Sequence, residues 1–510
     1  MTWFAAILLL VVAAIILITI HDVVQRKHTI LRNFPVIGHF RYLLEKIGPE
    51  LRQYIVTDND EERPFSRDER RWVYTSSKRL NNYFGFGTDN DIENPPAGYP
   101  IIKQSTFPAP AVAADHDELH PVPAAKVLGA ARNRKHAFRP ESIVNISAMS
   151  FGSLSGPAIV ALNRGARGAG CLHNTGEGGL SLHHQQGGEI IFQFGTGYFG
   201  VRDPDGAFDL ARLVDLAEAH PVKAIEIKLS QGAKAGLGGM LLGAKVTPEI
   251  AAIRGIPVGQ DCASPASHTA FSDIDGLLEL VETIADATGR PVGIKSAVGD
   301  LGFWQDLTDR MVATGTGPDF VTVDGGEGGT GAAPLAFSDH VSLPFRHAFP
   351  RVYRTFAERD LHTGTVFVGS GKLGLPTSAL QALIMGCDVL GVAREAMMSI
   401  GCIQAQICES GRCPTGVATQ RPRYTRGLDP ADKSVRLTNY IISLRKELLA
   451  LAHACGQSHP ALVGMDRIEF LEDRWRSTSA ATIFGYLDPE FGLPSRTDRE
   501  DIDTLMQTAQ

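Results

Sequence analysis

The first stretch of the chain is almost entirely apolar. Residues 3–20 contain a single polar side chain, Thr19. As a helix, with a rise of about 1.5 Å per residue, this run approaches the ~30 Å thickness of a bilayer core. The nearest cations all follow the run: Arg26, Lys27 and Arg32. A secretory signal carries its cations before the apolar stretch, so we predict a single-pass cell-membrane anchor over residues 1–27 with a cytoplasmic body. A buried N-terminal helix is the alternative.

Beyond the anchor, the hydrophobic pattern changes three times. Residues 28–56 repeat apolar side chains near a helical period, which predicts a helix on the membrane or on the body, within an N-terminal segment at 28–140. Residues 57–140 are charged and rich in proline, which indicates an irregular wrapping segment. The region 141–425 is expected to be the main domain, and 426–510 a helical C-terminal extension.

The main domain alternates short apolar runs with helical patterns. The expected strands are 143–149, 171–173, 190–194, 224–229, 292–297, 320–324, 366–369 and 389–392. Helical patterns between them include 157–168, 274–288, 304–314 and 378–385. Nearly continuous apolar strands that alternate with helices indicate a parallel sheet buried on both faces. Eight strands over about 250 residues predict an α/β fold, a (β/α)8 TIM barrel. A doubly wound open sheet is the alternative.

Composition narrows the possible functions. The chain has 510 residues, of which 44% are hydrophobic, and a formal charge of −7, so it has no global attraction to nucleic acid. Its 53 glycines are about a tenth of the 510 residues, above the usual share of about 7%. Such an excess is typical of backbone that approaches a ligand closely. Seven cysteines are too few for a disulfide scaffold.

Polar and glycine-rich clusters follow most of the expected strands, where a barrel enzyme places its chemistry. Gly369, Ser370 and Gly371 end the seventh strand and Gly391 lies on the eighth, the region where barrels commonly bind phosphate. Ordinary glycine turns are the alternative. Three matches to the GxGxxG pattern occur, but none opens a clear dinucleotide-binding unit. We therefore expect no nicotinamide domain.

Three lysines lie at or beside these strand ends: Lys228, Lys234 and Lys295. An unpaired lysine is costly to bury. We therefore expect each to face a phosphate, a carboxylate or a flavin pyrimidine.

Three cysteines are close in sequence. Cys402, Cys408 and Cys413 have the spacing C-x5-C-x4-C. Three soft thiolates within twelve residues suit an iron–sulfur cluster. Structural zinc prefers four ligands, and no histidine lies close by as an obvious fourth. Zinc and unligated cysteines remain alternatives at this point.

Taken together, these motifs resemble the flavin-binding synthase domain of glutamate synthases. The resemblance runs from about residue 65 to 425 and includes the segments 149–153, 174–179, 227–234, 324–331 and 401–420. With its apolar N-terminal run, the chain looks most like the short bacterial branch called FMN-binding glutamate synthase family proteins.

The resemblance implies a barrel that binds FMN and a 3Fe–4S cluster. The cluster ligands would be Cys402, Cys408 and Cys413. The residues that line the flavin would be Ser150, Gly152, Lys295, Gly325, Gly326, Gly369, Ser370, Gly371 and Gly391. Glu177 would match the active-site glutamate and serve in proton transfer or ammonium placement. Cationic residues that hold 2-oxoglutarate would correspond to Lys228, Lys234 and Arg254.

The chain also departs from that family. It shows no amidotransferase domain, so ammonia is expected from another source, and a separate protein such as a ferredoxin or reductase is expected to donate electrons. Leu237 and Met240 occupy positions that are polar in the family, so one contact to the oxoacid is expected to be lost. The leading interpretation is an oxidoreductase that converts 2-iminoglutarate to L-glutamate. A flavoenzyme acting on another amino or oxo acid, and an electron-transfer subunit without turnover, are the alternatives.

Overall fold

A computed structural model describes residues 2–25, 28–52, 60–83, 85, 87–109 and 119–508. The chain divides into two compact units, Met1–Arg70 and Arg71–Gln510. The predicted boundaries at residues 27, 140 and 425 mark changes of composition and stay predictions.

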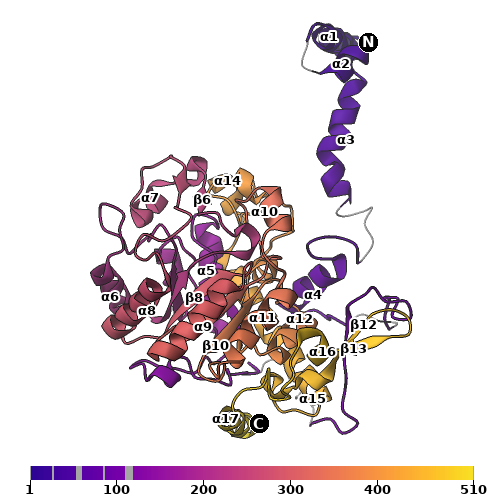
Figure 1. The fold of residues 1–510 in the computed structure, drawn as a ribbon. Helices are drawn as coiled ribbons and strands as arrows, with labels where there is room; N and C mark the ends of the chain where they lie inside the picture. The colour runs from indigo at the N-terminus through magenta and orange to yellow at the C-terminus, as the bar shows by residue number, and fades with distance from the viewer. Residues whose placement is uncertain are drawn as a thin grey trace. The chain divides into compact units, whose positions relative to one another are not determined.

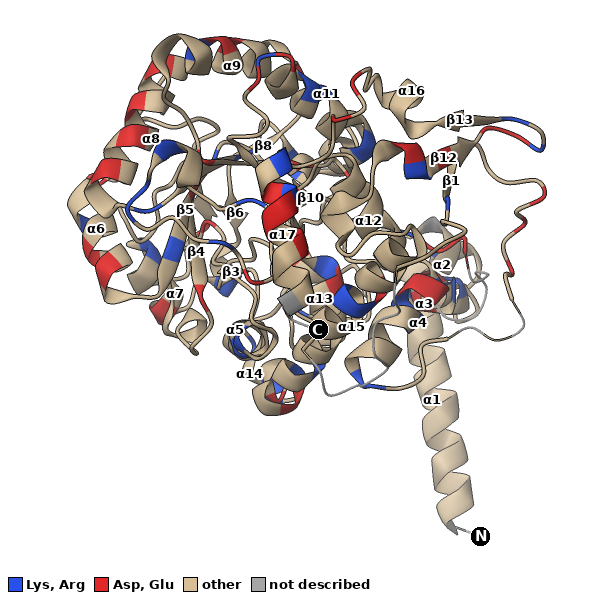
Figure 2. Cartoon of the chain, turned by 90° about the horizontal axis from the view of Figure 1, so that it is seen from below, with Lys and Arg blue, Asp and Glu red and all other residues tan. Residues whose placement is uncertain are grey.

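The first unit begins with α1 (Thr2–Val24), a helix of 23 residues. Its stretch Trp3–Val24 has a mean hydropathy of 3.0 and is not buried, and it is long and apolar enough to cross a bilayer. Figure 2 shows this helix almost without charged residues. The predicted apolar helix is therefore present, although a signal sequence has the same length and composition. Arg26 and Lys27 lie outside the described residues.

The helix expected over 28–56 is split into α2 (Thr29–Asn33) and α3 (Gly38–Leu51). Phe34 ends α2 because the next residue is Pro35, and a proline disfavours the helical conformation of the residue before it. The buried Asp22 accepts hydrogen bonds from the backbone N–H of Val36 and from His39 Nε2, both at 2.9 Å. The C-terminal end of α1 is thereby tied to the start of α3. Residues 53–56 lie outside the described part.

The second unit contains a closed barrel of eight parallel strands (Figure 1). The strands, in their order around the barrel, are β10 (Val366–Ser370), β11 (Val389–Val392), β2 (Val144–Ile146), β3 (His173–Asn174), β4 (Ile190–Phe194), β5 (Val222–Lys228), β8 (Val292–Ala297) and β9 (Phe320–Asp324). Almost every strand residue is buried, as parallel strands covered on both faces require. The predicted (β/α)8 barrel is confirmed, and the open sheet is excluded.

Helices surround the barrel (Figure 1). Those between the strands are α5 (Gly156–Ala169), α6 (Leu210–Ala219), α7 (Pro248–Arg254), α8 (Ile274–Thr288), α9 (Gly302–Thr314), α10 (Leu335–His340), α11 (Phe345–Ala357) and α12 (Pro376–Ile384). After β11 follow α13 (Arg394–Ser399), α14 (Pro422–Thr425) and the long α15 (Pro430–Ala454), which packs against α5. At some of these helices a side chain at the N-terminus accepts a backbone hydrogen bond, as Ser155 does at α5.

Two predicted segments differ from the structure. The segment expected to be irregular contains α4 (Arg67–Ser77) and β1 (Tyr99–Ile102). The extension expected to be helical also contains β12 (Ile468–Leu471) and β13 (Ser477–Ser479), besides α16 (Ala480–Phe484) and α17 (Arg496–Thr508). β1, β12 and β13 form a three-stranded antiparallel sheet. The three strands are only three or four residues long, and β1 pairs with a strand more than 300 residues away, so the local signal is weak.

Candidate active site

The predicted acid and its lysines meet at the carboxyl ends of the barrel strands. Glu177 follows β3, Lys228 is the last residue of β5, and Lys234 lies in the short turn after it. Lys228 Nζ is 2.6 Å from Glu177 Oε1, and Lys234 Nζ is 3.8 Å from the same oxygen. Parallel strands bring their carboxyl ends to one rim, which explains why residues more than fifty positions apart form one cluster.

The charges in this cluster are strongly coupled. Burial raises the pKa of Glu177, but the charges of Lys228 and Lys234 and a hydrogen bond from Lys228 outweigh it and bring this pKa to about 2. Burial and the neighbouring Lys228 lower the pKa of Lys234. A carboxyl group ionised throughout the neutral range is a poor proton donor. Glu177 is therefore expected to carry its negative charge throughout the neutral range.

Arg254, the last residue of α7, is buried with few partners. The residue is 6% exposed, and Nη2 donates to the carbonyl of Phe151 at 3.2 Å. Its guanidinium carbon lies 5.1 Å from the Phe199 ring centroid. Nε is buried without a hydrogen bond, and no carboxylate among the described residues forms an ion pair with the guanidinium. A buried guanidinium with most of its five donors unused is suited to an anionic ligand.

A small hairpin of β6 (Met240–Leu241) and β7 (Cys262–Ala263) lies over this arginine. Leu241 pairs with Cys262, whose Sγ is 4.0 Å from Arg254 Nη1, and a Cβ added to Gly152 would be 3.1 Å from Arg254 Nη2 and 3.2 Å from Leu241 Cδ2, so Leu241 lies on the side of the hairpin that faces the arginine. Successive strand residues face opposite sides. Met240 accordingly points the other way and is 44% exposed, and Leu237 is 37% exposed. The sequence analysis named Met240 as a residue near the substrate but not Leu241, because the direction of Leu241 follows only from the pairing of the two hairpin strands.

Lys295 lies within β8, beside Lys228 in the strand register. Its Nζ is 3.4 Å from Asp324 Oδ1, and Asp324 Oδ2 accepts the backbone N–H of Gly232 at 2.8 Å. Asp324 therefore links the flavin-assigned lysine to the loop that carries Lys234. Asp324 directly precedes the glycine-rich segment 325–331, and this position in the sequence was the available signal for its linking role.

Four neighbouring positions can form a cradle for a phosphate group. Gly371 has a φ of 135° and its Cβ would lie 3.3 Å from the Cα of Gly325, so only glycine fits there without strain. A Cβ on Gly391 would lie 3.3 Å from Ser147, whose hydroxyl is 3.4 Å from that of Ser370. Ser147 and Gly391 line the same cavity as the buried Lys295, and the two serine hydroxyls can donate to the phosphate of a flavin.

Other glycines assigned to the flavin have structural contacts. The N–H groups of Gly325 and Gly326 donate to the carbonyls of Ser370 and Leu343, at 2.8 and 2.9 Å. A Cβ on Gly369 would lie 2.8 Å from Cys387 Sγ, because this residue faces the outer packing. Of the remaining assignments, the Ser150 hydroxyl donates to Ser153 at 3.0 Å. A Cβ on Gly325 would lie 2.7 Å from Phe345 Cβ and one on Gly326 3.0 Å from the carbonyl oxygen of Ser342, so these glycines are closely packed, and their flavin assignment stays a prediction.

The three cysteines lie in the loop after α13. Burial raises the pKa of Cys402 to about 11, with the nearby Cys408 and Cys413 adding to the shift. Burial also raises the pKa of Cys408, whereas for Cys413 hydrogen bonds, mainly from backbone N–H groups, outweigh burial and lower it. Within the described residues, no three His, Cys, Asp or Glu side chains form a group that could hold a metal ion. The donor chemistry of the three neighbouring thiols nevertheless fits an iron–sulfur cluster.

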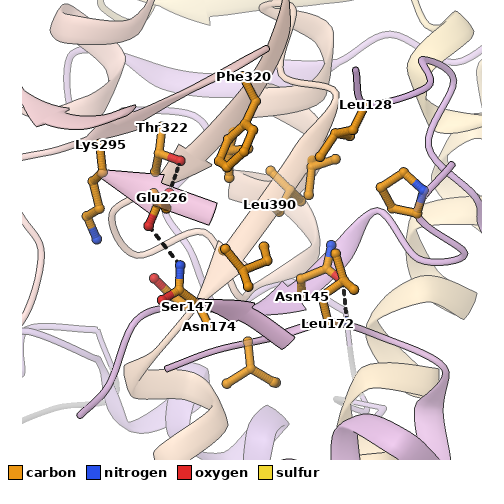
Figure 3. A pocket seen from close by; sticks show the side chains of 16 residues that line it. Leu128, Asn145, Ser147, Leu172, Asn174, Glu226, Lys295, Phe320, Thr322 and Leu390 are labelled. Carbon is orange, nitrogen blue, oxygen red and sulfur yellow. Dashed lines mark hydrogen bonds between the residues drawn. The ribbon is translucent and has the colours of Figure 1, made fainter. Parts of the chain in front are cut away.

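One buried carboxylate was not predicted at all. Glu226 points into the barrel, where it accepts hydrogen bonds from Asn174, Gln193 and Thr322. It borders a small cavity of about 30 Å³, lined on one side by polar groups and on the other by apolar ones such as Phe320 (Figure 3). The glutamate lies within an apolar strand pattern, which was the available signal.

Replacing Glu177 by Gln is expected to lower the free energy of unfolding by about 3 kcal/mol at pH 7. The drop in pKa from 4.5 to about 2 gives this figure at about 1.4 kcal/mol per unit. Because the native pKa is lowered, the stabilisation is complete above the ordinary value and is lost as the pH falls from about 4.5 to 2. Urea unfolding over this range measures the difference. Glu249→Gln, which alters a half-exposed carboxylate paired with His183, is the control and should change little. If the difference in the free energy of unfolding between wild type and Glu177→Gln stayed constant with pH, this electrostatic account would be contradicted.

A family model and several known proteins are similar to this chain, and they point to the same family. The conserved region in glutamate synthase matches residues 108–458. The glutamate synthase large subunit-like protein YerD of Bacillus subtilis (strain 168) is 38% identical over 490 residues, covering 89% of this chain and 92% of that protein. The archaeal-type glutamate synthase (NADPH) of Thermotoga sp. (strain RQ2) is 35% identical over 320 residues, and the archaeal glutamate synthase (NADPH) of Methanocaldococcus jannaschii is 35% identical over 319. Each alignment with these last two covers 61% of this chain and 59% of the relative.

Proposed function

The chain belongs to the glutamate synthase family, and we propose that it reduces 2-iminoglutarate, formed from 2-oxoglutarate and ammonia, to L-glutamate. The observation that carries this proposal is the buried cationic site of Lys228, Lys234 and Arg254 around one carboxylate, Glu177. Three positive charges and one negative charge leave a net charge of about +2, which matches a dicarboxylate.

Arg254 would bind one substrate carboxylate, because a guanidinium offers two parallel donors to a carboxylate. Lys228 and Lys234 would bind the second carboxylate or the 2-oxo group. Glu177 would hold the ammonium ion next to the carbonyl carbon, a role that its lowered pKa supports. This arrangement brings the two reactants together before reduction, which lowers the entropic part of the barrier.

FMN, when bound, would supply the hydride that no side chain can provide. Lys295 would place its positive charge beside the ring, and Ser147, Ser370, Gly371 and Gly391 would hold the phosphate. The charge on Lys295 is partly balanced by Asp324 at 3.4 Å, so the pair can stabilise added negative charge without leaving a buried cation unpaired.

A 3Fe–4S cluster on Cys402, Cys408 and Cys413, when bound, would deliver single electrons. Lys245 donates to the carbonyl of Cys408 at 2.6 Å, and its positive charge would offset the negative charge of the thiolates. A Cβ on Gly331 would lie 3.2 Å from Cys408 Cβ, so the cysteine loop touches the loop that follows β9. The electron donor would be a separate protein such as a ferredoxin or a reductase.

A less polar oxo acid is the second candidate substrate. Leu241 faces Arg254, and the exposed Leu237 lies nearby in sequence on the same loop. An apolar wall beside one carboxylate site suits an acid with a single carboxylate and a hydrocarbon side chain. Adding 2-oxoglutarate and ammonium to the chemically reduced holoenzyme and measuring L-glutamate tests the first candidate against the second.

The N-terminal helix would anchor the enzyme in the cell membrane, with the barrel in the cytoplasm. Deletion of residues 2–27 is expected to move the protein from the membrane fraction to the soluble fraction with its FMN retained, since no residue assigned to the flavin is removed. Fractionation and flavin absorbance measure both. Full-length protein that is soluble without detergent would contradict the anchor.

A further inference from the structure

Glu226 lies one layer below the candidate active site, on the same strand as Lys228. It is 2% exposed. Oε2 accepts hydrogen bonds from Asn174 Nδ2 at 2.8 Å and from Gln193 Nε2 at 2.5 Å, and Oε1 accepts one from Thr322 Oγ1 at 2.5 Å. Figure 3 shows Asn174 and Thr322 reaching the carboxylate from opposite sides. One carboxylate therefore joins β3, β4 and β9 to β5.

These contacts determine which way the Asn174 amide points. The carboxylate accepts only from the amide nitrogen, which turns Asn174 Oδ1 outward to the loop. There Oδ1 accepts the backbone N–H of Gly176 at 3.0 Å. Gly176 directly precedes Glu177, and its φ of 66° is the left-handed conformation that favours glycine. The orientation of this amide thus sets the backbone that carries Glu177.

A second connection runs through Gln193. While its side chain donates to Glu226, its backbone N–H donates to the hydroxyl of Thr175 at 3.0 Å. The loop of Gly176 and Glu177 is therefore held from two neighbouring strands, and both connections meet at Glu226.

We propose that Glu226 is a positioning residue for the active site: it fixes Asn174, and through Asn174 and Gly176 the place of Glu177 between Lys228 and Lys234. The importance of that place for catalysis rests on the proposed function, whereas the mechanical link does not. The role requires hydrogen-bond acceptors at Glu226, not its negative charge.

Glutamine provides a variant that separates acceptors from charge. In Glu226→Gln, the amide oxygen can accept from both Asn174 and Gln193, as Oε2 does, and the NH2 group can donate to the Thr322 hydroxyl. Glu226→Leu removes all three hydrogen bonds at similar volume. Asn174→Ala breaks the link one step later and leaves Glu226 with two donors. If Glu226→Leu does not fold, Asn174→Ala still tests whether the Asn174 amide holds the Glu177 loop, a step that the proposal requires.

Asn145 offers a matched control in the same cavity. It is 3% exposed, and its side chain bonds to the carbonyl of Ser142 at 2.8 Å and to the N–H of Leu172 at 2.7 Å, both toward the strand beginnings. Asn145→Leu therefore removes a buried amide from the barrel without touching the Glu177 loop.

Hydrogen–deuterium exchange of the full-length holoenzyme, followed in peptides that cover residues 174–179, tests the proposal. Loss of one hydrogen bond, about 1.4 kcal/mol, corresponds to roughly tenfold faster local exchange. We expect this increase in Glu226→Leu and Asn174→Ala, with exchange within about threefold of wild type in Glu226→Gln and Asn145→Leu. Equal exchange in wild type and Asn174→Ala, or a Glu226→Gln variant as fast as Glu226→Leu, would overturn the proposal.

Steady-state kinetics separate this inference from the proposed function. If both hold, Glu226→Gln keeps a near-normal KM for 2-oxoglutarate, and Asn174→Ala raises it about tenfold or more. Faster exchange in an enzyme that forms no glutamate even as wild type would leave the positioning role intact and reject the proposed function alone.

Discussion

Arg254→Ala is expected to weaken the binding of 2-oxoglutarate about 30-fold or more. Arg254 is 6% exposed, has an unbonded Nε and forms no ion pair within the described part of the chain, so a bound carboxylate would be its main ionic partner. Losing one member of a buried charge pair costs about 2–5 kcal/mol, and each 1.4 kcal/mol is about tenfold in affinity. Titration of the oxidised holoenzyme with 2-oxoglutarate gives the dissociation constant.

Arg202→Ala is the matched control for this substitution. Arg202 also lies over Phe199, at 5.2 Å from the ring centroid, but it donates to the carbonyl of Gly255 rather than into the site. Its removal should change the affinity by no more than about threefold, while both variants retain FMN. Equal losses in the two variants would mean that Phe199 packing, not carboxylate binding, explains the effect of Arg254.

Cys408→Ser is expected to abolish the iron content of anaerobically purified protein while leaving most of the FMN. A hydroxyl is a poor substitute for a thiolate toward iron, and two remaining ligands do not hold a 3Fe–4S cluster. Iron analysis and visible absorption measure the loss. FMN should remain because the assigned cradle of Ser147, Ser370, Gly371 and Gly391 lies on other strands.

Cys455→Ser provides the comparison for the cluster. Cys455 is buried at the end of α15, far in sequence from the cysteine loop, with its thiol 3.8 Å from the carbonyl of Lys103. This variant should keep its iron. Zinc instead of iron in the wild-type protein, or full iron content in Cys408→Ser, would contradict the cluster assignment.

The barrel was predictable because most of its strands lie in local apolar runs, although β3 (His173–Asn174) consists of two polar residues. Strands such as 190–194 and 320–324 agree with the structure residue for residue. The helix α4 was missed although its capping box is visible in sequence, with Ser66 and Glu69 exchanging hydrogen bonds. The sheet of β1 and β12 was missed for a different reason: Tyr99 pairs with Leu471, and local patterns do not encode such distant partners.

The candidate site was predictable where a motif lies at a strand end. The Lys228–Glu177 pair follows from that logic, and the structure brings the two together. The direction of a side chain in a short hairpin cannot be read from the sequence. The sequence therefore drew attention to Met240, whereas in the structure its neighbour Leu241 is turned toward Arg254. Glu226 was overlooked because its three donors come from separate strands, and only the closed barrel assembles them.

Rapid mixing of the chemically reduced holoenzyme with substrates tests the central claim most directly. With 2-oxoglutarate and ammonium together, the flavin absorbance is predicted to return to that of the oxidised form and L-glutamate to appear in the same amount. Either compound alone should leave the flavin reduced, and Arg254→Ala should require at least about 30-fold more 2-oxoglutarate for the same rate. A wild-type flavin that stays reduced in the presence of both substrates would contradict the glutamate-forming function.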